Sequence, residues 1–173
     1  ILISDQISSV SFVGSTPVAK YIYEQSAKYG KRVQSLGGAK NHLIVMPDAN
    51  IDQATNGIIG AAFGSAGERC MAVSVAVAVG DIADKLIENV KNKAESLKVA
   101  PYTDTNSDMG PVISKDHLSK IHGYIQSGVE EGANLIMDGR KIKIQGYENG
   151  YFLGPTLFDN VNDTMKIYQE EIF

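Results

Sequence analysis

The stretch Gly67-Glu-Arg-Cys-Met-Ala-Val-Ser-Val-Ala-Val-Ala-Val79 combines a fold signal with the single cysteine of the chain. Residues 73–79 form a short apolar run rich in valine, which is typical of a buried strand. The small residues of 60–67 come before Cys70, and the apolar spacing over 48–63 indicates a helix that ends in those glycines. The stretch therefore predicts a helix, a turn that carries Cys70, and a buried strand.

The alternation of strand and helix continues on both sides of this stretch. Residues 10–14 predict a strand, and Thr16 and Pro17 then open a helix as its N-cap and its first residue. Gly30 is a natural end for that helix. Further strands are expected at 43–46, 134–137 and 141–145, an extended segment at 154–158, and further helices at 115–132 and behind an N-cap at Asp81. This order predicts an α/β fold with a mostly parallel sheet and flanking helices.

Composition narrows the class of protein. The 173 residues are 43% hydrophobic and 21% charged, which is ordinary for a globular chain of one domain, or of one domain and part of another. The net charge of -4 provides no basic field for nucleic acid. No apolar run approaches the roughly 20 residues of a membrane helix. A single cysteine excludes an internal disulfide framework and fits a reducing compartment, so we expect a cytoplasmic location, or the mitochondrial matrix in a eukaryote.

Cys70 has two possible roles on the residues alone. A free cysteine is often a small hydrophobic residue of the core. Gly64 and Gly67, however, let backbone or ligand approach closely, and the fixed positive charge of Arg69 favours a thiolate. The spacing leaves both roles open, and it makes Cys70 the candidate nucleophile.

The other candidate sites are weaker. The strand-to-helix turn at Gly14-Ser15 is either a plain helix cap or an anion site formed by free backbone N–H groups. Gly37-Gly38 is a flexible turn or a close approach to a ligand. Glu170-Glu171 is most simply a solvated charge pair. We propose no metal, because three residues show no ligand spacing: His42, His117 and His122.

Five motifs in this order resemble the NAD(P)-dependent aldehyde dehydrogenases. They are Phe12-Val-Gly-Ser-Thr16, Leu36-Gly-Gly-Ala-Lys-Asn41, Gly67-Glu-Arg-Cys70, Gly154-Pro-Thr156 and Glu171-Ile-Phe173, the last of which opens a Glu-Ile-Phe-Gly-Pro motif. Met46-Pro-Asp-Ala-Asn50 and Asp138-Gly-Arg-Lys-Ile142 resemble most the methylmalonate-semialdehyde dehydrogenase branch. That branch produces a coenzyme A thioester rather than a free acid.

The resemblance implies roles for individual residues. Cys70 would attack the aldehyde carbonyl, and its own N–H would be one oxyanion donor. Gly14 and Ser15 would face the NAD pyrophosphate, and Leu36 and Gly37 would lie against the nicotinamide. Glu171 would bind the nicotinamide ribose with Phe173 nearby.

The resemblance also implies how the chain is organised. We expect 1–38 to be the C-terminal part of an NAD-binding domain and 39–173 to be an incomplete catalytic domain. The chain starts at Ile1 and stops without a polar tail, so we interpret it as an internal piece that is inactive alone. The full-length enzyme is expected to form a homo-oligomer, a dimer or tetramer.

Ser35 departs from the pattern of the hydrolytic family members, which carry glutamate at this position. Because a serine cannot abstract a proton from water near neutral pH, hydrolysis of an acyl-enzyme should be slow, and coenzyme A becomes the expected co-substrate. Arg69 is a candidate contact for a substrate carboxylate, or it tunes Cys70. The alternatives are a hydrolytic aldehyde dehydrogenase, a cysteine hydrolase with a histidine base, and a non-catalytic module with Cys70 in its core. The choice of NAD or NADP stays open.

Overall fold

The computed structural model describes residues 1–173, which divide into two compact units, Ile1–Ala39 and Lys40–Phe173. Each unit is described by itself. The division falls beside the expected boundary between 38 and 39, while the assignment of the two parts to a cofactor domain and a catalytic domain stays a prediction. None of the helices has the length and apolarity needed to cross a bilayer.

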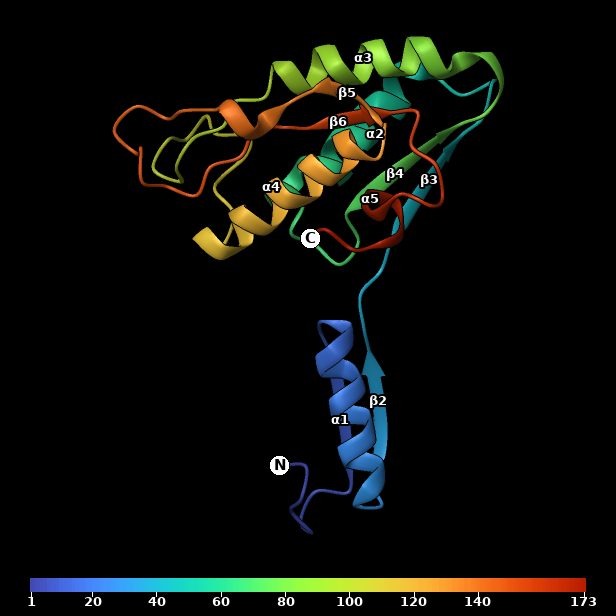
Figure 1. Cartoon of the computed structure of the whole chain (residues 1–173), viewed down its shortest axis with the longest axis vertical. Helices are drawn as coiled ribbons and strands as arrows, with labels where there is room; N and C mark the ends of the chain where they lie inside the picture. Colours follow the sequence, from blue (N-terminus) through green and yellow to red (C-terminus); the bar gives the residue numbers. More distant parts are fainter. The chain divides into compact units, whose positions relative to one another are not determined.

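The first unit is a β-α-β element (Figure 1). It consists of β1 (Ser9–Val13), α1 (Thr16–Lys28) and β2 (Arg32–Leu36). The two strands are parallel and in register from Ser9 opposite Arg32 to Val13 opposite Leu36. The parallel register places the carboxyl ends of both strands at one edge, beside the start of α1. Strand β2 was not expected from the sequence, because its Arg-Val-Gln-Ser-Leu composition is mostly polar.

The start of α1 differs from the prediction by one residue. Ser15 is the N-cap residue, without a side-chain cap, and Thr16 is already helical, so Pro17 is the second residue of the helix. The expected N-cap at Thr16 is therefore wrong. Its Oγ1 instead accepts a hydrogen bond of 3.0 Å from the N–H of Gly38, in the loop after β2.

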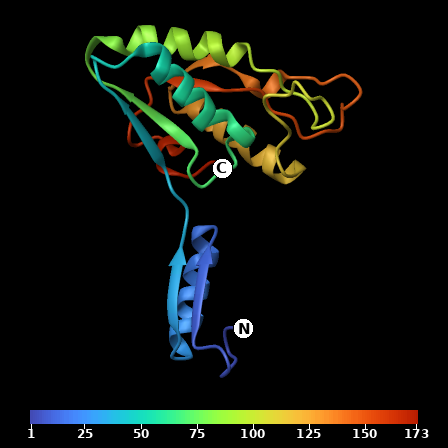
Figure 2. The same cartoon turned by 180° about the vertical axis from the view of Figure 1, so that it is seen from behind.

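The first half of the second unit alternates strand and helix. It contains β3 (Asn41–Val45), α2 (Ile51–Phe63), the short helix η1 (Gly64–Gly67), β4 (Val73–Ala78), η2 (Gly80–Ile82) and α3 (Ala83–Glu95). Strands β3 and β4 are parallel, and α2 packs against both α3 and β4 (Figures 1 and 2). Six buried residues make the core between them: Val45, Ile58, Ile59, Leu86, Val90 and Ala94.

The second half of this unit forms another small layer. It contains α4 (Lys115–Glu130), β5 (Asn134–Met137), η3 (Gly139–Lys141), β6 (Leu157–Asp159) and α5 (Lys166–Gln169). Strands β5 and β6 are antiparallel, and α4 packs on α5 and β5. Tyr124 of α4 and Ile167 of α5 are buried together in this layer.

The predicted α/β class with mostly parallel strands is confirmed, since two of the three strand pairs are parallel. The strand expected at 141–145 is wrong. Asp138 accepts a hydrogen bond from the N–H of Arg140 and starts η3, after which the chain is irregular. The expected cap at Asp81 is also wrong, because α3 begins after Ile82 without a side-chain cap.

Candidate active site

Cys70 lies in an exposed turn between η1 and β4. The turn is closed by a hydrogen bond of 3.0 Å from the N–H of Ala72 to the carbonyl of Arg69, so Cys70 and Met71 occupy its two central positions. The thiol is open to solvent and takes no part in the hydrophobic core. This position contradicts the interpretation of Cys70 as a core residue and leaves its sulfur free to meet a substrate.

The backbone before this turn is strained. Ser65 and Ala66 have φ values of 53° and 54°, and Gly67 has a φ of 78°. Left-handed conformations cost a residue with a Cβ about 1–2 kcal/mol each. Backbone strain of this kind is concentrated at functional sites, where the surrounding structure maintains it. Here it bends the chain away from α2 and directs it into the turn that carries Cys70.

The guanidinium of Arg69 folds back over the strained segment. Its Nε donates a hydrogen bond of 3.1 Å to Ser65 Oγ. A Cβ at Gly64 would come within 2.8 Å of Nη1, so the glycine makes room for the guanidinium. Arg69 is exposed and forms no ion pair with a carboxylate of the chain. Its charge and its remaining donors are therefore available to an anion.

Glu68 fastens the other side of the turn to the start of α4. Its Oε1 accepts a hydrogen bond of 3.2 Å from the N–H of Ile113 and lies 3.3 Å from Nε2 of His117. The same Nε2 contacts the backbone oxygen of Phe173. Both side chains of the pair are largely buried, with 16% exposed on each. Glu68 thus links the Gly-Glu-Arg-Cys motif to α4 and, through His117, to the segment after α5.

Asn41 also holds the nucleophile turn, and the sequence did not single it out as a site residue. Its side-chain Nδ2 donates 2.9 Å hydrogen bonds to the carbonyls of both Cys70 and Ala72. The available signal was a pair of polar residues, Asn41 and His42, at the start of a strand that is otherwise apolar. That signal is weak, because its partners are remote in the sequence.

The segment before Glu171 is pinned by several side chains. Lys40 Nζ donates a 2.6 Å hydrogen bond to the carbonyl of Glu170, and the Tyr124 hydroxyl donates one of 2.6 Å to its carboxylate. Burial and this hydrogen bond raise the pKa of Tyr124 to about 12. Burial lowers the pKa of Lys40, against the opposing influence of Glu171 and Glu170. Glu170-Glu171 is therefore more than the solvated charge pair expected, because Glu170 is bonded and Glu171 is half-buried.

The first unit brings four predicted cofactor residues to one edge. Gly14 donates a backbone hydrogen bond of 3.1 Å to the carbonyl of Leu36, which joins the ends of β1 and β2. A Cβ at Gly37 would come within 2.8 Å of Thr16 Oγ1, so the loop passes directly over the start of α1. Ser15 is exposed at this helix terminus, and the first turn holds no acidic residue. Such a terminus suits an anion, because its free N–H groups and the helix dipole both favour negative charge.

Ser35 lies in β2 immediately before this loop. Its hydroxyl donates a hydrogen bond of 2.6 Å to the carbonyl of Ala19 in α1. The hydroxyl proton is thus used in a hydrogen bond that joins β2 to α1.

The three histidines have partners or surroundings away from the thiol. His42 bonds to Lys40 and Tyr168, and His117 pairs with Glu68. The Nε2 atom of His122 is buried without a hydrogen-bond partner. None of the three is hydrogen-bonded to Cys70, so a cysteine hydrolase with a histidine base has no support in this geometry.

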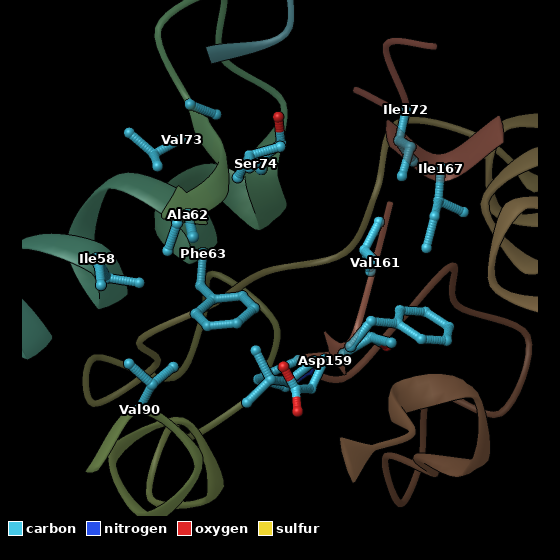
Figure 3. Close-up of a pocket in the computed structure, with 18 of the residues that line it drawn as sticks. Ile58, Ala62, Phe63, Val73, Ser74, Val90, Asp159, Val161, Ile167 and Ile172 are labelled. Carbon is cyan, nitrogen blue, oxygen red and sulfur yellow. The ribbon is translucent and has the colours of Figure 1, made fainter. Parts of the chain in front are cut away.

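The second unit also contains a mostly apolar pocket of about 610 Å³ that is partly open to solvent (Figure 3). Phe63 of α2 stands on one side of it and Ile167 of α5 on the other. Strand β4 bonds only to β3 and β6 only to β5, and residues of both strands border the cavity. Gly67 and Ala72 lie in its wall, whereas Cys70 does not. No histidine, lysine or arginine lines it, so we place the chemistry at the turn rather than in this cavity.

The second unit therefore contains an exposed cysteine in a restrained turn, and the first unit contains a strand-helix edge that suits an anion. A model of the aldehyde dehydrogenase family matches residues 1–173. The chain belongs to the aldehyde dehydrogenase family. The match covers every residue, so the resemblance seen in the sequence motifs is confirmed.

The relatives include a narrower group of aldehyde dehydrogenases. The chain is 52% identical to malonate-semialdehyde dehydrogenase of Pseudomonas aeruginosa, over 100% of this chain and 35% of that protein. A Sinorhizobium meliloti protein, provisionally named methylmalonate-semialdehyde dehydrogenase and solved with NAD, matches at a TM-score of 0.97 and 56% identity over 99% of this chain and 35% of that one. Methylmalonate-semialdehyde dehydrogenase from Oceanimonas doudoroffii matches at a TM-score of 0.96 and 55% identity, with the same coverage. The chain thus spans about a third of these relatives.

Proposed function

We propose that the full-length protein oxidises malonate or methylmalonate semialdehyde with NAD and transfers the acyl group to coenzyme A. The single observation that carries this proposal is the exposed Cys70, held in a restrained turn within a chain of this family. The names of the relatives support the choice of aldehyde. Residues 1–173 alone are expected to produce no NADH.

Cys70 is the nucleophile in this mechanism. Its thiolate attacks the aldehyde carbon, a C–S bond forms, and the carbonyl oxygen becomes an oxyanion near the N–H of Cys70. NAD, held by the residues assigned below, would supply the acceptor for the hydride that leaves this carbon. The carbonyl re-forms, so Cys70 then carries an acyl thioester. The thiolate of coenzyme A attacks this thioester, and Cys70 leaves as a thiolate that is ready for the next turnover.

The residues of the first unit fit the cofactor by their geometry. The start of α1 offers Ser15 and free N–H groups to a pyrophosphate, and the absence of acidic residues from its first turn avoids repulsion. Gly37 allows the loop to pass close to Thr16, and a side chain there would disturb both. We assign Gly14 and Ser15 to the pyrophosphate and Leu36 and Gly37 to the nicotinamide.

Glu171 and Phe173 complete the proposed cofactor contacts. Glu171 is half-buried beside Lys40, and we assign its carboxylate to the nicotinamide ribose. Carboxylates accept hydrogen bonds readily from sugar hydroxyls, because both oxygens are acceptors. Phe173 is exposed and follows two residues later, where its ring can cover the nicotinamide.

The choice of coenzyme A over water depends on Ser35. Its hydroxyl donates to the carbonyl of Ala19 and has no basic partner, so it cannot activate a water molecule. An acyl group on Cys70 is therefore long-lived, and a thiol is a better nucleophile than water. The acyl-enzyme is thus expected to wait for coenzyme A.

Arg69 is assigned to the carboxylate of the substrate. It is exposed, adjacent to Cys70 in sequence, and without an ion-pair partner in the chain. A guanidinium binds a carboxylate through two parallel hydrogen bonds, which would orient the aldehyde carbon. The competing role, tuning of Cys70 by the charge, would affect all aldehydes equally.

A product assay on the full-length protein tests this function. Malonate semialdehyde and NAD are supplied with and without coenzyme A, and both NADH and the acyl product are measured. We expect steady thioester formation only with coenzyme A. Rapid release of free acid without coenzyme A would assign the protein to the hydrolytic aldehyde dehydrogenases instead. Absence of NADH under both conditions would contradict the proposal altogether.

A further inference from the structure

We propose that Lys40-Asn41-His42 is a positioning element that holds the Cys70 turn and the segment before Glu171 in one fixed arrangement. This inference rests on the proposed function, because it assumes that Cys70 and Glu171 act on one aldehyde and one cofactor. Asn41 is its central residue and acts on the reaction through the backbone of Cys70.

Asn41 donates hydrogen bonds to backbone carbonyls at the point where the pairing of β3 with β4 is irregular. Asn41 is opposite Val73 and His42 is opposite Val75, so the register shifts between them. The backbone ladder begins only at Val73, and the carbonyls of Cys70 and Ala72 lie before it. The side chain of Asn41 bonds to both of these carbonyls, at 2.9 Å each. It therefore extends the contact between β3 and β4 back to the nucleophile.

The chemistry of an amide matches this task. The Nδ2 group of asparagine has two N–H donors, and both are used by the two carbonyls. Aspartate has the same shape but, when ionised, only accepts. Serine offers a single donor on a shorter side chain. Among side chains of this size, asparagine alone supplies two donors from one atom, so the two bonds are specific to Asn41.

These bonds fix the direction of the Cα–Cβ bond that carries the thiol. Fixing the carbonyl of Cys70 fixes the peptide plane between Cys70 and Met71. The turn bond from Ala72 to Arg69 and the second bond from Asn41 to Ala72 hold the other end. The Cα–Cβ direction of Cys70 is then set by its backbone. Displacement of a reacting atom by about 1 Å can reduce a rate about 100-fold, so this orientation matters for attack on a carbonyl.

Lys40 and His42 extend the same element to the other side. Successive side chains of an extended chain point in opposite directions, and the contacts follow this rule. Lys40 Nζ bonds to the carbonyl of Glu170 at 2.6 Å, and His42 Nε2 lies 3.0 Å from the Tyr168 hydroxyl. Nδ1 of His42 is 2.9 Å from the carbonyl of Lys40, which can only accept. In neutral His42, Nδ1 therefore carries the proton and Nε2 accepts from Tyr168.

Three consecutive residues thus hold two segments that are far apart in the sequence, the Cys70 turn and the residues that lead from α5 to Glu171 (Figure 1). A shift of 40–42 would displace both segments together. The two outer contacts predict an effect on the cofactor, and the central contact predicts an effect on the nucleophile.

The test is Asn41→Asp in the full-length protein, which keeps the shape and removes both donors. We expect kcat to fall by about 10- to 100-fold while KM for NAD changes less than about twofold. The rate of Cys70 labelling by iodoacetamide should change as well, and this measurement needs no activity. In the Asn41→Asp variant, kcat should recover as the pH is lowered, because a protonated aspartate has an O–H group that can donate one hydrogen bond. The matched control is Asn92→Asp on the exposed side of α3, which should leave kcat and labelling unchanged.

A second variant keeps the test decisive if Asn41→Asp does not fold. Asn41→Ser retains a single short donor and should lower kcat by an intermediate factor. An unchanged kcat and an unchanged labelling rate in either folded variant would overturn the role of Asn41. If the wild type forms no thioester, the proposed function fails, and the labelling rate still decides whether Asn41 positions Cys70.

Lys40→Met tests the other half of the element. Loss of the bond to Glu170 should raise KM for NAD by about tenfold and lower kcat less, because Lys40 acts on the cofactor side. Lys85→Met, on an exposed position of α3, is the control. An effect on kcat alone, with KM for NAD unchanged, would contradict the link between Lys40 and the Glu171 segment.

Discussion

The two candidate regions of the molecule are constructed in different ways. The edge formed by β1, α1 and β2 presents mainly backbone N–H groups and glycines, with Ser15 at the start of α1. The Cys70 turn is held by side chains, namely Asn41, Glu68 and Arg69. A site made of backbone should be sensitive to added volume, whereas a site made by side chains should be sensitive to lost donors and charges.

The largest effect is expected at the nucleophile itself. Cys70→Ser should lower kcat by at least about 1,000-fold, because a hydroxyl without an adjacent base is a poor nucleophile. NAD binding, measured by quenching of protein fluorescence or by calorimetry, should be unchanged. Met71→Leu, at the exposed neighbouring position of the turn, is the control and should retain activity. A Cys70→Ser variant with near-normal turnover would remove Cys70 from the mechanism.

The backbone-made site is tested by added volume. In Gly37→Ala the new Cβ would lie 2.8 Å from Thr16 Oγ1 and 3.2 Å from its Cα. Because the backbone of α1 cannot move away easily, we expect the Kd for NAD to rise about tenfold.

Gly57→Ala is the matched control for added volume. Nothing lies within 4 Å of its new Cβ in α2, so it should leave NAD binding unchanged and stabilise the protein by about 0.5–1 kcal/mol. Equal Kd values for NAD in Gly37→Ala and the wild type would show that this edge tolerates an added side chain. That result would contradict the contrast drawn between the two regions.

The charge-dependent site is tested by Arg69→Gln. Loss of the guanidinium should lower kcat/KM for malonate semialdehyde by about 10- to 100-fold, since hydrogen bonds to charged groups contribute about 1.5–3 kcal/mol. For propanal, which has no carboxylate, the loss should be much smaller. An equal loss for both aldehydes would instead indicate that Arg69 acts on Cys70.

The smallest effect is expected away from both regions, at Asp138 and Arg140. The Arg140 guanidinium, 2.7 Å away, holds the pKa of Asp138 at about 2. Because the folded pKa lies below the unfolded value of about 3.9, the pair stabilises the protein above that value and loses the contribution as the pH falls toward 2. Asp138→Asn should lower the free energy of unfolding by about 1 kcal/mol at neutral pH and flatten its decline in acid. Thermal unfolding as a function of pH measures this, and NAD binding should not change.

The parts of the molecule that the sequence predicted are those with local causes. The turn at Cys70 and the long helices follow from glycines and apolar spacing within a few residues, and the start of α1 was predicted to within one residue. Strand β2 was missed because its face is mostly polar, and α5 because four residues are too few for a helical period. The alternating polar and apolar residues of 141–145 led to the wrong strand prediction, because this pattern also fits an irregular segment on a half-buried surface.

The contacts that restrain the site could not be predicted, because they join distant parts of the chain. Asn41 meets Cys70 across 29 residues and Lys40 meets Glu170 across 130 residues. A single sequence contains no signal that pairs them. The motif residues are therefore visible in the sequence, whereas the residues that position them emerge only from the fold.

Mass spectrometry of the Cys70 peptide tests the central claim most directly. The full-length protein is mixed with malonate semialdehyde and NAD in the absence of coenzyme A, quenched in acid and digested. We predict an acyl group on Cys70 in stoichiometric amount, which disappears when coenzyme A is added before the quench. An unmodified Cys70 in a sample that has formed one equivalent of NADH would contradict the account.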